Sequence, residues 1–151
     1  MGIQIGTLCV RRSAFIQASP ARVWQEFTTA DRISAWLNRG HVLENIEPVP
    51  GGTVTFNVDI EGAIRSFGGT VIDVTEPAEM SFAINWHDAD MAWPAATLWT
   101  YRLTPCYDGT LVELFHHGFE RLGADAVDAL IGYEWGWDVK HLAALKEIVE
   151  G

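Results

Sequence analysis

Three titratable residues near the end of the chain have a spacing that could bring their side chains together. Glu134, Asp138 and His141 follow one another at intervals of four and three residues, so on a helix they project from one face. Crowding and desolvation raise the pKa of a carboxyl group and fit it for proton transfer. The chemistry would be general acid–base catalysis, with His116 or Tyr101 as a further proton donor or acceptor.

A structural interpretation of the same residues is simpler, and we favour it. At an open cavity mouth, or hydrogen-bonded to neighbours, these groups would catalyse nothing. No nucleophile or oxyanion-stabilising set accompanies them, so the sequence names no reaction. His116 and His117 are adjacent, and on a strand they would point to opposite faces and could not share a metal ion. We therefore predict neither a metal nor a cofactor.

The pattern over residues 124–149 predicts one long C-terminal helix. Apolar residues recur there at helical intervals, at Val127, Leu130, Ile131, Leu142, Leu145, Ile148 and Val149. At a rotation of ~100° per residue, Glu134, Asp138 and His141 fall within this stripe and Trp137 lies at its edge. Unpaired charges are costly to bury, so we expect this part of the stripe to face a partly polar pocket.

The rest of the chain predicts an antiparallel sheet with two short helices. Residues 3–17 alternate as a first strand does, and Ser19-Pro20 then favours a helix that runs to about Thr28. Asp31 is suited to cap a second helix. From residue 41 to residue 119, alternating runs separated by turn residues predict a meander.

The last hairpin of this meander gives a register. With Asp108-Gly109 as the central turn residues, Leu103 pairs with Leu114 and Tyr101 with His116. This register separates apolar pairs from charged pairs, whereas a slip by one residue would mix them. Tyr101 and His116 are therefore expected on the buried face of the sheet.

A cavity between the sheet and the C-terminal helix is the expected binding site. Apolar walls with few polar anchors are typical of sites for small organic ligands, and aromatic side chains favour the same interpretation. The expected cavity residues are Phe56, Val58, Phe82, Ile84, Trp99, Tyr101, Leu114, His116, Glu134, Trp137, Asp138 and His141.

Composition excludes several classes of partner. A chain of 151 residues predicts a single domain over residues 1–151, and its net charge of −10 repels nucleic acids. No apolar run approaches the ~20 residues of a membrane span, and no signal peptide is evident. Cys9 and Cys106 form neither a disulfide framework nor a zinc spacing. We expect a cytoplasmic protein that does not insert into membranes.

The order of several short motifs resembles the heat-shock-protein-90 ATPase activator homologue family, within the SRPBCC (START and Bet v 1-like) superfamily. The motifs span nearly the whole chain: Ser19-Pro20-Ala21-Arg22-Val23-Trp24, Ser34-Ala35-Trp36-Leu37, Pro50-Gly51-Gly52, Gly69-Thr70-Val71, Glu76-Pro77, residues 108–114, His117-Gly118-Phe119 and Gly136-Trp137. The resemblance implies an α+β helix-grip fold of β-α2-β6-α topology, in which a curved antiparallel sheet surrounds a long C-terminal helix.

Binding of a small hydrophobic or amphipathic molecule is therefore the predicted function. The first alternative is a cofactor-independent enzyme, such as a cyclase, dehydratase or hydrolase, that uses the cavity carboxylates. The second is a module that binds a chaperone or another protein, and a homodimer is plausible for a domain with 7 Trp residues. Fold alone does not decide among these functions.

Overall fold

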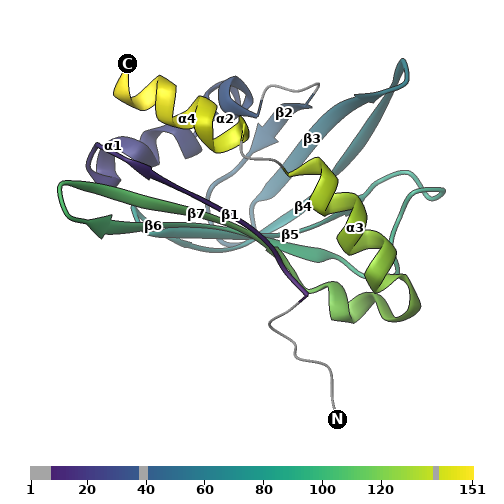
Figure 1. The fold of residues 1–151 in the computed structure, drawn as a ribbon. Coiled ribbons are helices and arrows are strands. Elements are labelled where there is room, and N and C mark those ends of the chain that lie inside the picture. The colour runs from purple at the N-terminus through teal and green to yellow at the C-terminus, as the bar shows by residue number, and fades with distance from the viewer. Residues whose placement is uncertain (1–7, 38–40, 138–139) are drawn as a thin grey trace, which may run out of the picture.

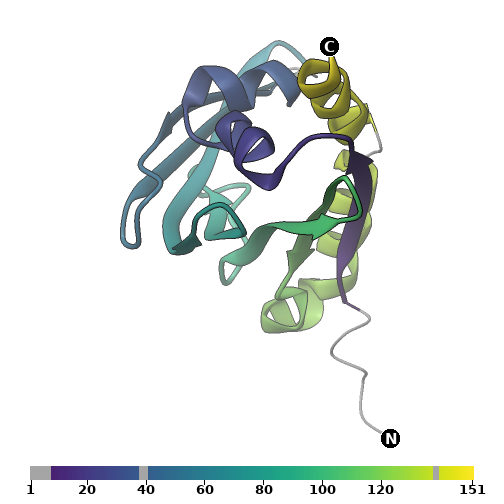
Figure 2. The ribbon, with the colours of Figure 1, turned by 90° about the vertical axis from the view of Figure 1, so that its left-hand side faces the viewer.

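The computed structural model describes residues 8–37, 41–137 and 140–151. Within them, one antiparallel sheet has the strand order β1-β7-β6-β5-β4-β3-β2 (Figure 1). Figure 2 shows the sheet curled into a half-barrel with the helices on its concave side. The strands are β1 (Val10–Ile16), β2 (His41–Ile46), β3 (Thr53–Ile60), β4 (Ala63–Thr75), β5 (Glu79–Trp86), β6 (Thr97–Cys106) and β7 (Gly109–His117). This confirms the predicted α+β helix-grip fold.

The helices form two groups, one between β1 and β2 and one after β7. The first group is α1 (Pro20–Trp24), η2 (Gln25–Phe27) and α2 (Ala30–Trp36), and the second is η3 (Phe119–Asp125), α3 (Ala126–Gly136) and α4 (Lys140–Glu150). Helix α4 contacts both α2 and β1, which closes the curled sheet at one end. Among the described helices, none combines the length and apolar character needed to cross a membrane.

The first helical group begins where its capping residues dictate. Ser19 Oγ accepts a hydrogen bond from the backbone N–H of Arg22, and Pro20 opens α1 as predicted. The cap of α2 differs from the prediction, because Thr29 Oγ1 accepts from the N–H of Arg32 and Asp31 lies within the first turn. Of the predicted first strand, residues 3–7 lie outside the described residues.

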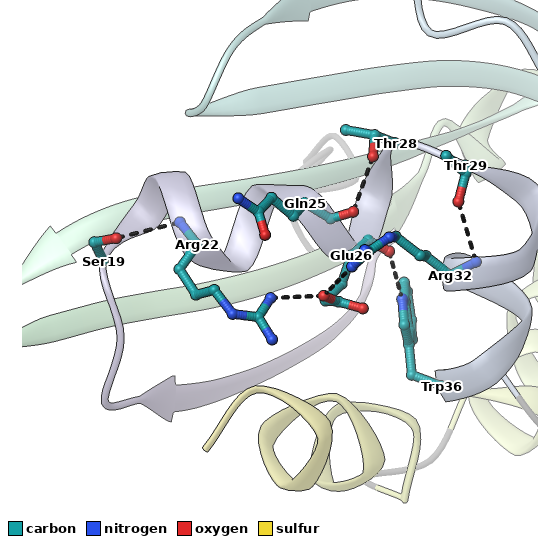
Figure 3. A network of polar contacts seen from close by, with 8 residues as sticks. All are labelled: Ser19, Arg22, Gln25, Glu26, Thr28, Thr29, Arg32 and Trp36. Atoms are coloured by element: carbon teal, nitrogen blue, oxygen red, sulfur yellow. Dashed lines mark hydrogen bonds and ion pairs between the residues drawn. The ribbon is translucent and has the colours of Figure 1, made fainter. Parts of the chain in front are cut away.

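A nearly buried carboxylate joins these two short helices (Figure 3). Glu26 accepts hydrogen bonds from Arg22 Nη1 at 2.6 Å and from Arg32 Nη1 at 2.8 Å. Its backbone carbonyl oxygen accepts a third from Trp36 Nε1 at 3.1 Å. Hydrogen bonds to charged groups are the stronger ones, so Glu26 holds α2 against η2 and fixes one end of the concave face.

The substitution Glu26→Gln is expected to lower the free energy of unfolding by about 1–3 kcal/mol. An amide oxygen accepts from the two arginines without a negative charge, but both arginines are partly exposed and can rehydrate, which limits the loss. Urea unfolding measures the change. Glu147→Gln, at an exposed position of α4, is the matched control; equal effects of the two variants would show that the pairing adds no stability.

The register of the last hairpin differs from the prediction by two residues. Tyr101 pairs with Leu114, and Trp99 pairs with His116. Cys106 pairs with Gly109, so the central turn residues are Tyr107 and Asp108, with Tyr107 at a φ of 53°. Because side chains alternate with a period of two, this shift keeps every residue on its expected face. Tyr101 and His116 are both buried, as predicted.

The C-terminal segment is two helices rather than one. Helix α3 ends at Gly136, and Trp137 is extended, with φ −93° and ψ 105°. The expected stripe does not describe α3, because Val127 and Ile131 are 61% and 56% exposed. Ala129 is buried in their place, and Tyr133 packs against the core. In α4 the expected apolar face is present, with Leu142 and Leu145 buried.

Candidate ligand cavity

A cavity of about 260 Å³ lies between the sheet and the C-terminal helices. Strands β3 to β6 supply one wall, and helices α3 and α4, with Trp137 and Leu37, supply the other. Most of the lining side chains are apolar or aromatic: Leu37, Phe56, Val58, Ile60, Phe67, Trp86, Trp99, Gly132, Tyr133, Trp137 and His141. Apolar walls with few polar groups are characteristic of small-molecule sites.

The aromatic walls are held by contacts among themselves. The rings of Phe56 and Phe67 are stacked at 4.9 Å with an interplanar angle of 10°. The rings of Trp99 and Trp137 pack edge to face with centroids 4.5 Å apart, and the rings of Trp137 and His141 do the same with centroids 5.3 Å apart. Such pairs add to the stability that burial gives. The cavity is therefore bounded by side chains with little freedom to collapse into it.

His116 lies behind this wall and connects its two halves. Trp137 Nε1 lies 3.1 Å from His116 Nδ1, and Trp99 Nε1 lies 3.0 Å from His116 Nε2. A neutral imidazole accepts on only one ring nitrogen, so either tautomer has an indole N–H as its donor. The hydroxyl of Thr97 is 2.6 Å from the same Nε2. One imidazole thus connects β6, β7 and the residue that follows α3.

The surroundings of His116 keep its ring neutral. Burial lowers the pKa of His116 well below its usual value, and the neighbouring His117 lowers it further. The indole groups of Trp99 and Trp137 only donate hydrogen bonds, and an imidazolium ring would have no nitrogen left to accept from either of them. The neutral ring accepts from one indole, and the Thr97 hydroxyl is within reach of Nε2. His116 therefore has a structural role as a neutral ring.

The structure brings five of the expected cavity residues to the lining, namely Phe56, Val58, Trp99, Trp137 and His141. Five others are buried in the core but do not belong to the lining: Phe82, Ile84, Tyr101, Leu114 and His116. The hydroxyl of Tyr101 makes no hydrogen bond within the described residues, and burial raises the pKa of this group. It is poorly suited to exchange protons.

Glu134 is not a cavity residue. Its side chain is 56% exposed, and its carboxylate pairs with Arg12 Nη2 at 3.1 Å. Arg12 also donates to the backbone oxygens of Glu134 and Trp137, so it caps the C-terminal end of α3. Glu134 thus lies outside the face of α3 that meets the core, where Ala129 is buried and Tyr133 packs. Asp138 lies outside the described residues.

The sequence interpretation did not single out six of the lining residues: Leu37, Ile60, Phe67, Trp86, Gly132 and Tyr133. Ile60 and Trp86 continue the alternation of β3 and β5, so the period of the strands could have identified them. Gly132 and Tyr133 depend on the rotation of α3. The small buried residues Ala126 and Ala129 were the only signal for that rotation.

Comparison with known proteins places the chain in a family. The sequence profile described as activator of Hsp90 ATPase homolog 1-like protein matches residues 17–150. The chain belongs to this family. A comparison with curated proteins gives no match.

Solved structures resemble this activator-homologue-like chain in fold. Protein Ms6760 from Mycobacterium smegmatis aligns with a TM-score of 0.76 at 19% identity, covering 96% of this chain and 92% of that one. Protein CV1439 from Chromobacterium violaceum aligns with a TM-score of 0.73 at 19% identity, and the alignment covers 96% of this chain and 99% of that one. The AHSA1 protein SPO3351 from Silicibacter pomeroyi aligns with a TM-score of 0.73 at 20% identity, and the alignment covers 94% of this chain and 97% of that one. These likenesses bear on fold alone.

Proposed function

We propose that the chain binds a small, largely apolar molecule in the cavity between the sheet and α3. The observation that carries the proposal is the aromatic lining, in which the rings of Phe56, Phe67 and Trp99 are in mutual contact and enclose unfilled space. A hollow lined by apolar and aromatic side chains with few polar groups is what small organic ligands bind.

The size and polarity of the cavity indicate the kind of molecule. An engineered apolar cavity of about 150 Å³ holds benzene, so the present volume of about 260 Å³ has space for a substituted or bicyclic ring. Among the described lining residues, none is Asp, Glu, Lys or Arg. A bound ion would be desolvated without a counter-charge, so a neutral ligand is favoured.

Gly132 allows a sharp test of this site. A Cβ atom at Gly132 would meet nothing within 4 Å, so the helix accepts a side chain there. We expect Gly132→Phe to fill the cavity and abolish binding of α-methylstyrene, a neutral aromatic probe. Gly132→Ala is the matched control, because it removes the glycine and adds only one methyl group. It should bind the probe and be more stable by up to about 1 kcal/mol.

A thermal-shift titration measures both effects. For the parent chain and for Gly132→Ala, the probe at about ten times its Kd should raise the Tm by about 2–4 °C. For Gly132→Phe, the Tm should not respond to the probe. An equal response from the phenylalanine variant would place binding elsewhere, and no response from the parent chain up to the solubility of the probe would contradict the proposal.

A further inference from the structure

Tyr133 is the lining residue with a hydroxyl group, and its ring is held in place from behind. The ring packs against His116 with centroids 4.2 Å apart and against Phe119 at 5.8 Å. His116 is itself fixed by its contacts with Trp99 and Trp137. The orientation of the Tyr133 ring, which lines the cavity, is therefore set before any ligand binds.

The neighbours of this hydroxyl are hydrogen-bond donors. Burial raises the pKa of Tyr133, while the indole N–H groups of Trp93 and Trp86, which lie near its oxygen, act in the opposite direction. The buried indole N–H of Trp93 makes no hydrogen bond within the described residues. An indole N–H cannot accept a proton, so neither neighbour takes the hydroxyl hydrogen of Tyr133.

The hydroxyl hydrogen of Tyr133 therefore remains available for a hydrogen bond. Within the described part of the chain, no acceptor forms a hydrogen bond with its hydroxyl hydrogen. The raised pKa keeps the phenol protonated at neutral pH. A ligand group that pairs with this hydroxyl must be a hydrogen-bond acceptor. In an apolar cavity without described cations, a neutral acceptor costs the least free energy to desolvate.

We propose that Tyr133 donates a hydrogen bond to the carbonyl oxygen of a neutral aromatic ligand, so that the cavity favours aromatic ketones, aldehydes or quinones. This inference rests on the proposed function. A carbonyl oxygen accepts without needing to donate, which matches the donors of Tyr133 and Trp86 in the cavity lining. An ammonium group would instead bring further donors and a charge without a described counter-charge.

Two probes of the same shape separate this inference from simple burial. Acetophenone and α-methylstyrene differ only in the replacement of C=O by C=CH2. Isothermal titration calorimetry gives the Kd of each probe for the parent chain and for Tyr133→Phe. We expect the variant to bind acetophenone about tenfold more weakly, which corresponds to about 1.4 kcal/mol, and to bind α-methylstyrene unchanged.

A spectroscopic measurement on the parent chain supplies a second test that needs no variant. The C=O stretch of bound acetophenone should lie at the lower frequency that it has in an alcohol. A stretch at the frequency seen in a hydrocarbon solvent would overturn the inference, as would equal affinity of Tyr133→Phe and the parent chain for acetophenone. If neither probe binds the parent chain, the proposed function fails, and the inference fails with it.

Discussion

Replacing Trp137 with alanine is expected to lower the free energy of unfolding by about 3–5 kcal/mol. The side chain is only 5% exposed and joins parts of the molecule that are distant in sequence. Its ring packs against Trp99 and His141, its indole N–H donates to His116, and its carbonyl oxygen accepts from Arg12 at 3.0 Å. Alanine would keep the backbone contact with Arg12 but remove the three side-chain contacts, and it would enlarge the cavity beside it.

A second substitution at this position separates the ring from its hydrogen bond. Trp137→Phe retains much of the apolar contact but leaves His116 Nδ1 without its donor, and should cost about 1–3 kcal/mol. Val127→Ala is the control, because Val127 lies on α3 with its side chain exposed, and should change stability by less than about 0.5 kcal/mol.

Urea unfolding followed by circular dichroism gives the three values. We expect the loss of stability to decrease in the order Trp137→Ala, Trp137→Phe, Val127→Ala. If Trp137→Ala costs no more than Val127→Ala, the segment between α3 and α4 does not stabilise the fold through this residue.

The architecture of the sheet was predictable because strand periodicity tolerates an error of two residues. The turn assignment at Asp108-Gly109 was wrong, since Cys106 pairs with Gly109 and the central turn residues are Tyr107 and Asp108. The faces of β6 and β7 were nevertheless correct, because a shift by two preserves the alternation. The aromatic wall residues Phe56 and Trp99 were identified for the same reason.

The helix side of the site was less predictable, because a shift by two residues along a helix moves a side chain to a different face. A break at Trp137 changes the rotation of α3 relative to α4, and the expected stripe then assigns the wrong face. Tyr133, the neighbour of Glu134 in sequence, lines the cavity, whereas the carboxylate of Glu134 pairs with Arg12. On a helix, neighbouring residues point about 100° apart, so an error of one residue is enough to exchange an expected carboxylate for a phenol.

Moderate acid is the second condition expected to have a large effect, because His116 must stay neutral in the fold. Its pKa lies well below that of an unfolded histidine, which is about 6.5. As the pH falls below about 6.5, the unfolded chain takes up a proton that the folded chain does not, so the free energy of unfolding decreases. This one residue should cost about 1.4 kcal/mol at about pH 5.5 and a further 1.4 kcal/mol or so for each lower pH unit above its folded pKa.

Other groups contribute less, or at lower pH. His117 is half-buried, and its pKa is lowered mainly by burial, so it adds a smaller loss over the same range. The lowered pKa values of Glu47 and Glu150 affect stability only below about pH 4.5, where carboxylates take up protons. Among the groups with a shifted pKa, His116 therefore makes the larger contribution to the change that urea unfolding measures from about pH 7.5 to about pH 5.5.

Two comparisons assign the effect to this residue. His117→Gln should remove only the smaller part of the pH dependence. In the folded protein, the ring Cε1–H resonance of His116 should keep its chemical shift over this pH range. A ring that titrates near the ordinary value without loss of structure would contradict the buried, neutral role that we assign to His116 behind the cavity wall.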